Sequence, residues 1–153
     1  EKCAEHLKEI KGCVFITTGT KNIEDFERVR GANRFVYRVL PSASSIRECE
    51  KCGVRMEDIV AILGPVSEDM NYQMFKDYKA DYVLMVAEAY QADRDLLRAR
   101  ERLAPLGGAS PSQIVLQAIL SAEPHYVERD LEIMRQLQSD LQAQEQGLES
   151  PGL

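Results

Sequence analysis

Small polar residues gather in one segment that could bind an anionic group. Thr18, Gly19 and Thr20 follow the apolar run at residues 13–17, and a glycine between two hydroxyl-bearing residues is typical of a turn from a strand into a helix. Such a turn can offer hydroxyls and backbone N–H groups to a carboxylate or a phosphate. A solvated connection without a ligand explains the same residues, so both interpretations stay open at this point.

A second group that could do chemistry is the pair Cys49 and Cys52, whose C-x-x-C spacing occurs in zinc knuckles and redox pairs. A structural zinc site needs four ligands. The sequence holds no second close pair, and His6 and His125 lie far away along the chain. We therefore expect two reduced thiols near a helix end and no bound metal, with a metal or redox role as the alternative.

Composition bounds the classes of protein that need to be considered. The chain has 153 residues, of which 44% are hydrophobic and 29% charged, and its formal net charge is −6. This acidic balance argues against nucleic acid as a partner. No apolar run is long enough to span a bilayer and no secretory signal is visible. We therefore expect a cytoplasmic protein that has no membrane partner.

The chain changes character about halfway along its length. All seven lysines lie at or before Lys79, and residues 87–153 carry 6 basic and 11 acidic side chains. We predict an α/β lobe over residues 1–86, an α-helical module over residues 87–146 and a frayed tail over residues 147–153. A chimera of two unrelated segments would explain the shift, and so would chance variation in one natural protein.

The first part alternates short apolar runs with helical segments. Strands are expected at residues 13–17, 34–40, 58–63 and 81–86, and the intervening helices are expected to start at Asn22, at Ser42 or Ser44, and at Ser67. This alternation predicts right-handed crossovers and a Rossmann-like parallel sheet. Ligands of such sheets bind at the carboxyl ends of the strands, which here are the segments 17–21, 40–42 and 64–67.

Four motifs occur in order along this part and carry a resemblance to a known family. They are Val14-Phe-Ile-Thr-Thr-Gly-Thr-Lys-Asn22, Arg38-Val-Leu-Pro41, Ile62-Leu-Gly-Pro-Val-Ser-Glu68 with Asn71, and Ala80-Asp-Tyr-Val-Leu-Met85. Over roughly residues 12–85 this order resembles the second lobe of precorrin-6A (cobalt-precorrin-6A) reductases. The resemblance implies an oxidoreductase of cobalamin biosynthesis that uses NADPH to reduce a macrocyclic corrin precursor in a cleft between two lobes. It also implies two cofactor-binding turns, formed by Thr18, Gly19, Thr20 and Lys21 and by Gly64, Pro65 and Ser67.

The chain departs from that family in two respects. After the fourth motif the family continues with Lys-(Asp or Asn)-Ser-Gly, whereas Met85 here runs into Val86-Ala-Glu-Ala-Tyr90. The family's preceding lobe is also absent, so an active site shared between two lobes is incomplete. We expect a lobe that holds part of a cofactor or macrocycle, is inactive alone, and has a missing companion lobe as its partner. The catalytic residues stay unassigned.

The second part is helical, and residues 80–113 resemble a single tetratricopeptide-like hairpin. Residues of suitable size fall at the positions that this 34-residue repeat requires, namely Val83, Val86, Ala87, Tyr90, Ala99, Leu103 and Pro111. Residues 93–95 would form the turn between its two helices. One such unit cannot bury a core alone, so we expect it to pack on another part of the chain or on a second chain.

Two further helices are expected after this hairpin. Ser110, Pro111 and Gln113 form a helix start with a capping box, and the helix that follows is apolar on more than one face. The last helix, at about residues 125–146, has an apolar stripe that fits either an intramolecular seam or a dimer coil. The stripe consists of Val127, Leu131, Met134, Leu137 and Leu141. Self-association through residues 110–146, as a helical interaction or oligomerisation module, is therefore the alternative function.

Overall fold

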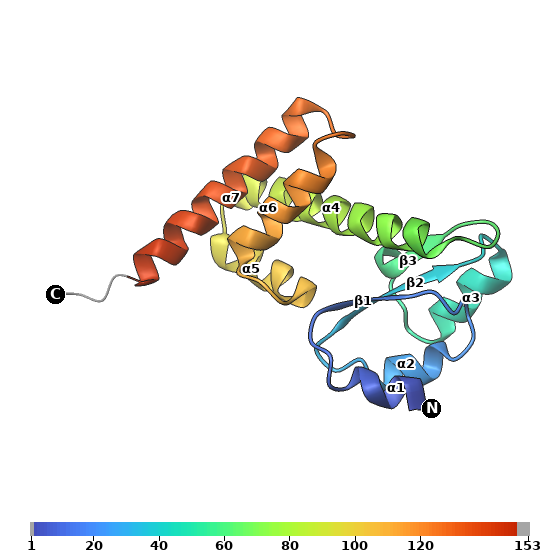
Figure 1. Ribbon diagram of the computed structural model, residues 1–153. Helices are drawn as coiled ribbons and strands as arrows, with labels where there is room; N and C mark the ends of the chain where they lie inside the picture. The colour runs from blue at the N-terminus through green and yellow to red at the C-terminus, as the bar shows by residue number, and fades with distance from the viewer. Residues whose placement is uncertain (1, 150–153) are drawn as a thin grey trace. The chain divides into compact units, whose positions relative to one another are not determined.

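The structure is a computed structural model that describes residues 2–149, with side chains described for residues 4–147. These residues form two compact units. The first consists of the chain up to Asn71 together with Pro105–Gly107, and the second of Tyr72–Ala104 together with the chain from Gly108 onward. Figure 1 gives the element labels used below.

The first unit is built on a three-stranded parallel sheet in the order β1-β2-β3. The strands are β1 (Cys13–Ile16), β2 (Arg34–Val39) and β3 (Ile59–Ala61), and the helices are α1 (Lys2–Leu7), α2 (Ile23–Val29) and α3 (Ala43–Lys51). In Figure 1, α2 and α3 connect neighbouring strands of the sheet. The predicted fold class, a Rossmann-like parallel sheet followed by helices, is confirmed.

The two sides of β2 face different surroundings. Phe35, Tyr37 and Val39 alternate along the strand and belong to the core that the sheet shares with the helices. Successive strand residues point to opposite faces, so Val36 and Arg38 lie on the other face. The helices contribute buried apolar residues to the same core, namely Ala4, Ile23, Phe26, Val29 and Cys49.

A buried charge cluster lies at the amino end of this sheet. Asp58 is fully buried in a short 3-10 helix, η1 (Met56–Asp58), and one of its oxygens lies 2.6 Å from the Arg34 guanidinium. Its other oxygen lies 3.0 Å from Arg55 and 3.8 Å from Arg30. Because Arg34 begins β2 and Asp58 directly precedes β3, these contacts join the starts of two neighbouring strands.

A tyrosine–carboxylate pair extends from the sheet to α2. The Tyr37 hydroxyl donates a hydrogen bond of 2.6 Å to Glu27, which also lies 3.2 Å from the Arg30 guanidinium. Burial, together with this bond to a carboxylate, raises the pKa of Tyr37 above its usual range. The phenol therefore stays protonated and acts as a donor at all ordinary pH values.

The starts of α2 and α3 differ in whether a side chain caps the helix. Ser42 caps α3 as predicted, because its hydroxyl accepts a hydrogen bond of 3.1 Å from the Ser45 N–H. The prediction that the Asn22 side chain caps α2 is wrong. Asn22 adopts a left-handed conformation with φ 65°, and its side chain makes no capping bond.

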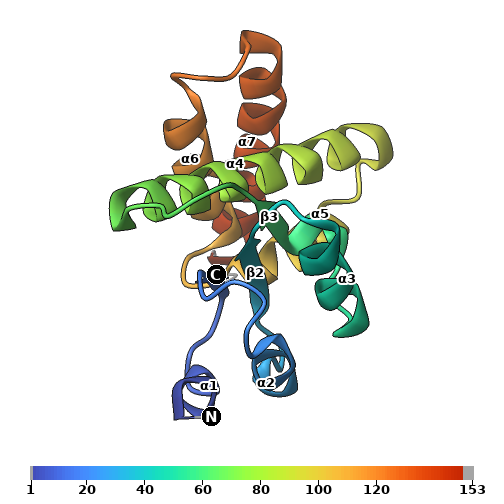
Figure 2. The same cartoon turned by 90° about the vertical axis from the view of Figure 1, so that its right-hand side faces the viewer.

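The second unit consists of helices. They are most of α4 (Glu68–Asp93), α5 (Leu96–Leu103), α6 (Pro111–Ala122) and α7 (Glu128–Glu149), and a 3-10 turn, η2 (Ala104–Leu106), follows α5. Helices α6 and α7 lie side by side in both views (Figures 1 and 2). Within the described part of the chain, no helix is both long enough and apolar enough to cross a membrane.

The fourth strand expected at residues 81–86 is wrong, because these residues lie inside α4. Ser67 starts this helix as predicted, accepting a hydrogen bond of 3.2 Å from the Met70 N–H. No glycine or proline follows before Asp93, so nothing in the sequence stops the helix. The buried residues of α4 follow a helical period; they are Ala80, Val83, Val86, Ala87 and Tyr90.

The turn expected at residues 93–95 is confirmed. Helix α4 ends at Asp93, and Asp95 caps α5 by accepting a hydrogen bond of 3.0 Å from the Arg98 N–H. The Tyr82 hydroxyl joins the two helices by donating to the Arg102 carbonyl at 2.9 Å. The apolar residues of α4 and α5 that supported the hairpin resemblance are buried, namely Val83, Val86, Ala87, Tyr90, Ala99 and Leu103.

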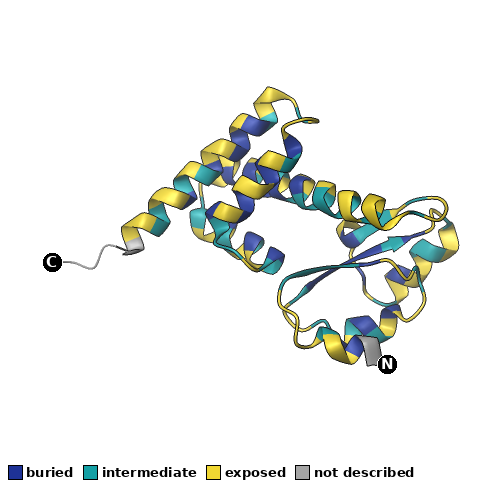
Figure 3. Ribbon diagram, viewed as in Figure 1, coloured by how far each residue is buried: buried dark blue, intermediate teal, exposed yellow. Residues whose placement is uncertain are grey.

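The start of α6 is confirmed and the start of α7 is corrected. Ser110 and Gln113 form the full capping box at α6, whereas α7 begins at Glu128, three residues later than expected. Val127 is therefore not part of the stripe and is exposed, while the other four stripe residues are buried. Buried and exposed residues alternate along α7 (Figure 3).

Residues 147–149 of the predicted tail belong to this helix, and residues 150–153 lie outside the described residues.

Polar contacts join α7 to three other helices of this unit. The hydrogen bonds run from Tyr90 to Asp140 at 2.8 Å, from Arg100 to Gln144 at 3.0 Å and from Ser112 to Glu145 at 2.5 Å. Tyr126, just before α7, donates to Asp81 of α4. Burial and the neighbouring carboxylates raise the pKa of Tyr90 and Tyr126 above the usual value.

Candidate functional site

The carboxyl ends of all three strands meet at one edge of the sheet. Because the strands are parallel and in register, with Ile16 opposite Tyr37 and Val39 opposite Ala61, the segments that follow them start from the same edge. These segments are residues 17–22 after β1, residues 40–42 after β2 and residues 62–67 after β3. We call this group of segments the carboxyl edge.

The residues that the sequence suggested as cofactor-binding fall into two groups at this edge. Thr18, Gly19, Thr20 and Lys21 lie between β1 and α2, and Gly64, Pro65 and Ser67 lie between β3 and α4. The strands β1 and β3 are the outer strands of the sheet, so the end of β2 separates the two groups. A ligand that touched both groups would therefore have to pass over the end of β2.

The segment after β1 is a tight turn beside an acidic pocket. Gly19 has a φ of 71°, a left-handed conformation that glycine adopts without strain. Thr18 and Lys21 are exposed, while Thr20 contributes to a pocket of about 270 Å³. The pocket is also lined by Asn22, Ile23, Glu24, Asp25, Glu48 and Cys52. Its three carboxylates repel an anion, so the pocket itself is a poor place for a phosphate.

The segment after β3 combines a turn with an exposed apolar residue. Gly64 has a φ of 81°, and Pro65 follows it in a fully exposed stretch. The Ser67 hydroxyl already accepts the hydrogen bond that starts α4, although it can still donate one to a ligand. Leu63, two residues beyond the end of β3, keeps 79% of its surface exposed.

The end of β2 carries a residue that the sequence did not single out as a site residue. The Arg38 guanidinium reaches β1 and donates a hydrogen bond of 3.2 Å from Nη2 to the Thr17 carbonyl. Its Nε is buried, and no group in the described part of the chain accepts a hydrogen bond from it. Arg38 belonged to one of the family motifs, but only the sheet order shows that it lies between the two predicted turns.

The structure places Cys49 and Cys52 at the end of α3. Both are free thiols, Cys49 buried and Cys52 half-buried. Burial raises the pKa of both thiols above the usual value, and nearby glutamates add to the effect at Cys52. Thiols of this kind are poor nucleophiles and metal ligands. Among the described side chains, no three His, Cys, Asp or Glu residues are grouped to hold a metal ion.

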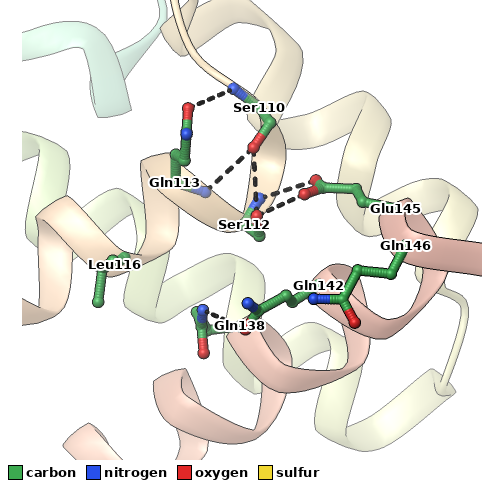
Figure 4. Close-up of a pocket in the computed structure, with 8 residues that line it drawn as sticks. All are labelled: Ser110, Ser112, Gln113, Leu116, Gln138, Gln142, Glu145 and Gln146. Atoms are coloured by element: carbon green, nitrogen blue, oxygen red, sulfur yellow. Dashed lines mark hydrogen bonds between the residues drawn. The ribbon is translucent and has the colours of Figure 1, made fainter. Parts of the chain in front are cut away.

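The helical unit has a larger surface pocket of about 480 Å³, shown in Figure 4. Its lining consists of Ser110, Ser112, Gln113, Leu116, Gln138, Gln142, Glu145 and Gln146. Glu145 of α7 accepts hydrogen bonds from the N–H of Ser112 at 3.1 Å and from its hydroxyl at 2.5 Å. The N-terminus of a helix attracts anions, and at the start of α6 the Glu145 carboxylate already occupies that position.

The Glu145 carboxylate is stabilised in its charged form. Partial burial alone would raise its pKa, but the hydrogen bonds from Ser112 and Ser110 and the charge of Arg100 hold the pKa of Glu145 below its usual value. These groups belong to α5, to α6 and to the residue that caps α6. The contacts of Glu145 thus join α7 to α5 and α6, and we interpret the pocket as a result of this helix packing.

The sheet-containing part of the chain matches a known family. The family model described as precorrin-6x reductase CbiJ/CobK matches residues 1–87. No solved structure matches the chain.

Three curated relatives share the same printed name, cobalt-precorrin-6A reductase. The relative from Priestia megaterium is 32% identical over 81 residues, which is 51% of this chain and 32% of that protein. The relative from Salmonella typhimurium is 32% identical over 74 residues, or 48% and 28% of the two chains. The relative from Methanothermobacter thermautotrophicus is 36% identical over 66 residues, or 43% and 22%. The matched segments thus span less than a third of each relative's own length.

Proposed function

Because the chain belongs to the precorrin-6x reductase family CbiJ/CobK, we propose that its sheet unit is a reductase lobe that holds part of NADPH at the carboxyl edge. The observation that carries the proposal is the parallel sheet itself, since ligands of such sheets bind where the strands end. The suggested cofactor-binding residues lie in two segments at that edge. When bound, NADPH would supply a hydride for reduction.

The groups at the carboxyl edge fit a phosphorylated cofactor in part. Lys21, Thr18 and Thr20 offer a positive charge and hydroxyl donors on the turn after β1, and Arg38 adds a second positive charge at β2. The carboxylates beside Thr20 oppose an anion there. We therefore place the cofactor's phosphates over the strand ends and away from the Thr20 pocket.

We further propose that the substrate is a corrin precursor, reduced in the cytoplasm with the help of a companion lobe. The printed names of the relatives support this substrate class. The matched segments cover at most 32% of any of these relatives, which supports an active site to which other residues contribute. On this proposal the chain alone binds ligand and does not turn over.

Hydrogen-exchange mass spectrometry with and without NADPH tests the cofactor proposal. We expect NADPH-dependent protection of residues 17–22, 40–42 and 62–67. The variant Lys21→Gln should weaken binding by about 3-fold to 10-fold, because it removes one exposed positive charge at the edge. Lys11→Gln is the matched control, since Lys11 is an exposed lysine outside these segments, and it should leave binding unchanged. Absence of any NADPH-dependent protection would contradict the proposal.

The second candidate function is a helical interaction module, in which a tetratricopeptide-like hairpin of α4 and α5 supports α6. The observation that favours it is an apolar ridge on α6, where Leu116 and Leu120 lie one turn apart and are both exposed. Light scattering at several protein concentrations tests self-association through residues 110–146. If the module self-associates, Leu120→Glu should lower the mass at high concentration. Leu97→Glu, at an exposed residue outside residues 110–146, should not change it.

A further inference from the structure

Arg38 has a hydrogen-bonding capacity that the described chain does not satisfy. Its Nη2 donates to the Thr17 carbonyl at 3.2 Å in an exposed setting, while its Nε is buried without a partner. A buried N–H of a charged group that stays unpaired lowers the stability of the folded protein. Such a group in a folded protein calls for an explanation, and a bound ligand that supplies the acceptor is one explanation. The orphaned Nε therefore marks the end of β2 as a place for an acceptor.

The charges along this part of the chain favour an anionic acceptor. From Arg34 to Arg47 the sequence contains no acidic residue. The first turn of α3 likewise has none, whereas α2 begins with Glu24 and Asp25 and α4 with an acidic pair of its own. Of the three segments at the carboxyl edge, the one after β2 thus opposes an anion least.

Exposed apolar side chains lie beside this positive position. Leu40 directly follows β2 and is 56% exposed, and Leu63 follows the neighbouring strand β3 and is 79% exposed. Side chains of this size are commonly buried, so two of them exposed at the ends of adjacent strands suit a flat apolar group of a ligand. A phosphate attached to a purine nucleoside combines the two required properties.

We propose that the carboxyl end of β2 binds the adenosine 2′-phosphate end of NADPH. Arg38 pairs with the 2′-phosphate, and Leu40 and Leu63 provide the surface on which the adenine rests. In dinucleotide-binding sheets an acidic residue about 20 residues after the first glycine turn holds the 2′-hydroxyl of NAD, and an arginine nearby accommodates the phosphate of NADP. Here Arg38 stands 19 residues after Gly19. The inference rests on the proposed function and adds the residues that hold the 2′-phosphate end of the cofactor.

Calorimetric titration with 2′,5′-ADP and 5′-AMP tests this assignment, because the two nucleotides differ only in the 2′-phosphate. The wild-type chain should bind 2′,5′-ADP about 10-fold more tightly or better. Arg38→Gln should reduce that preference to about 2-fold or less while leaving the affinity for 5′-AMP unchanged. Arg47→Gln removes the same charge from an exposed position on α3 and should keep the wild-type preference.

Two further measurements separate ligand binding from a structural role of Arg38. Leu40→Glu places a carboxylate beside the proposed phosphate at an exposed residue, so it should weaken 2′,5′-ADP binding more than 5′-AMP binding in a folded protein. Equal losses for both nucleotides in Arg38→Gln, or wild-type preference in Leu40→Glu, would overturn the assignment. A wild-type chain that binds NADPH without preferring 2′,5′-ADP would overturn this inference alone. A wild-type chain that binds none of these ligands would contradict the proposed function as well.

Discussion

In each of the two units, one carboxylate joins segments of the chain through hydrogen bonds or ion pairs. In the helical unit Glu145 supplies the acceptor that the first turn of α6 needs, through two hydrogen bonds to Ser112. In the sheet unit Asp58 balances the guanidinium groups of Arg30, Arg34 and Arg55. Each of these carboxylates joins segments that are distant in sequence, so each should have a measurable effect on stability.

The Glu145 contribution should depend on pH in a defined direction. Because the folded protein lowers the pKa of Glu145, its stabilising effect is complete above the ordinary pKa of a glutamate. The effect is lost as the pH falls through the lowered value. Glu145→Gln should cost about 1 kcal/mol at pH 7 and less at pH 3.

Urea unfolding at the two pH values measures this difference. Glu132→Gln, at an exposed glutamate of the same helix, is the control and should show little change at either pH. An equal cost of Glu145→Gln at both pH values would show that the charge of the carboxylate is not what matters.

Removing the charge of Asp58 should be far more damaging. Asp58→Asn keeps the shape of the side chain but removes the counter-charge beside the buried Arg34 guanidinium, which costs about 3–5 kcal/mol. Thermal unfolding measures the loss, with Glu50→Gln at an exposed position of α3 as the control. A melting temperature within about 2 °C of wild type would refute the view that this cluster holds β2 and β3 together.

The candidate site was only partly accessible to sequence reasoning. The turns at Gly19 and Gly64 could be located because each glycine follows an apolar strand, and both have a positive φ. The sequence could not show that Arg38 reaches the Thr17 carbonyl, because that contact depends on which strands are neighbours. It also gave no sign that Glu24 and Asp25 line the pocket beside Thr20.

Elements with strong local signals were predicted best. Strands β1 and β2 and helix α6 are bounded by turn or capping residues that act locally, as the capping box at Ser110 does. The strand prediction for residues 81–86 was wrong because a short apolar run fits a strand and a buried helical segment equally well. The absence of a stop signal after Ser67 was the better guide, and it indicates one continuous helix.

A pair of alanine substitutions in α4 distinguishes a helix from a strand. In a strand, Val83 and Met85 would lie on the same face. In α4, Val83 is 0% exposed and Met85 is 53% exposed. Val83→Ala should therefore cost about 1–2 kcal/mol in urea unfolding, and Met85→Ala should cost less than about 0.5 kcal/mol. Similar costs at the two residues would contradict the helical assignment.

At the scale of the whole molecule, the chain is divided into two compact units, and the family match ends at residue 87. The boundary between the compact units lies near Asn71 along the chain, and the division that the change of composition predicts near residue 86 stays a prediction. A change of composition shows where amino-acid usage changes along the chain. The boundary of a compact unit depends instead on which residues contact one another. Helix α4 continues across both positions. The hypothesis that residues 87–153 have a separate origin therefore stays a prediction.

The two units should lose protection separately when each is weakened. Hydrogen exchange at a low urea concentration should rise mainly within residues 2–71 in Asp58→Asn, and mainly within residues 110–146 in Glu145→Gln. Each variant serves as the control for the other. A uniform rise along the chain in either variant would mean that the units unfold together.

The paired phenols give this protein an unusual optical property. The chain has six tyrosines and no tryptophan, and Tyr37, Tyr90 and Tyr126 each donate to a carboxylate. A carboxylate that accepts this hydrogen bond quenches the emission of the phenol by taking its proton in the excited state. The folded chain should therefore be dim when excited at 280 nm, and it should brighten as Tyr37 leaves Glu27 in one unit and as Tyr90 leaves Asp140 in the other. Intrinsic emission can thus report the unfolding of both units without a label.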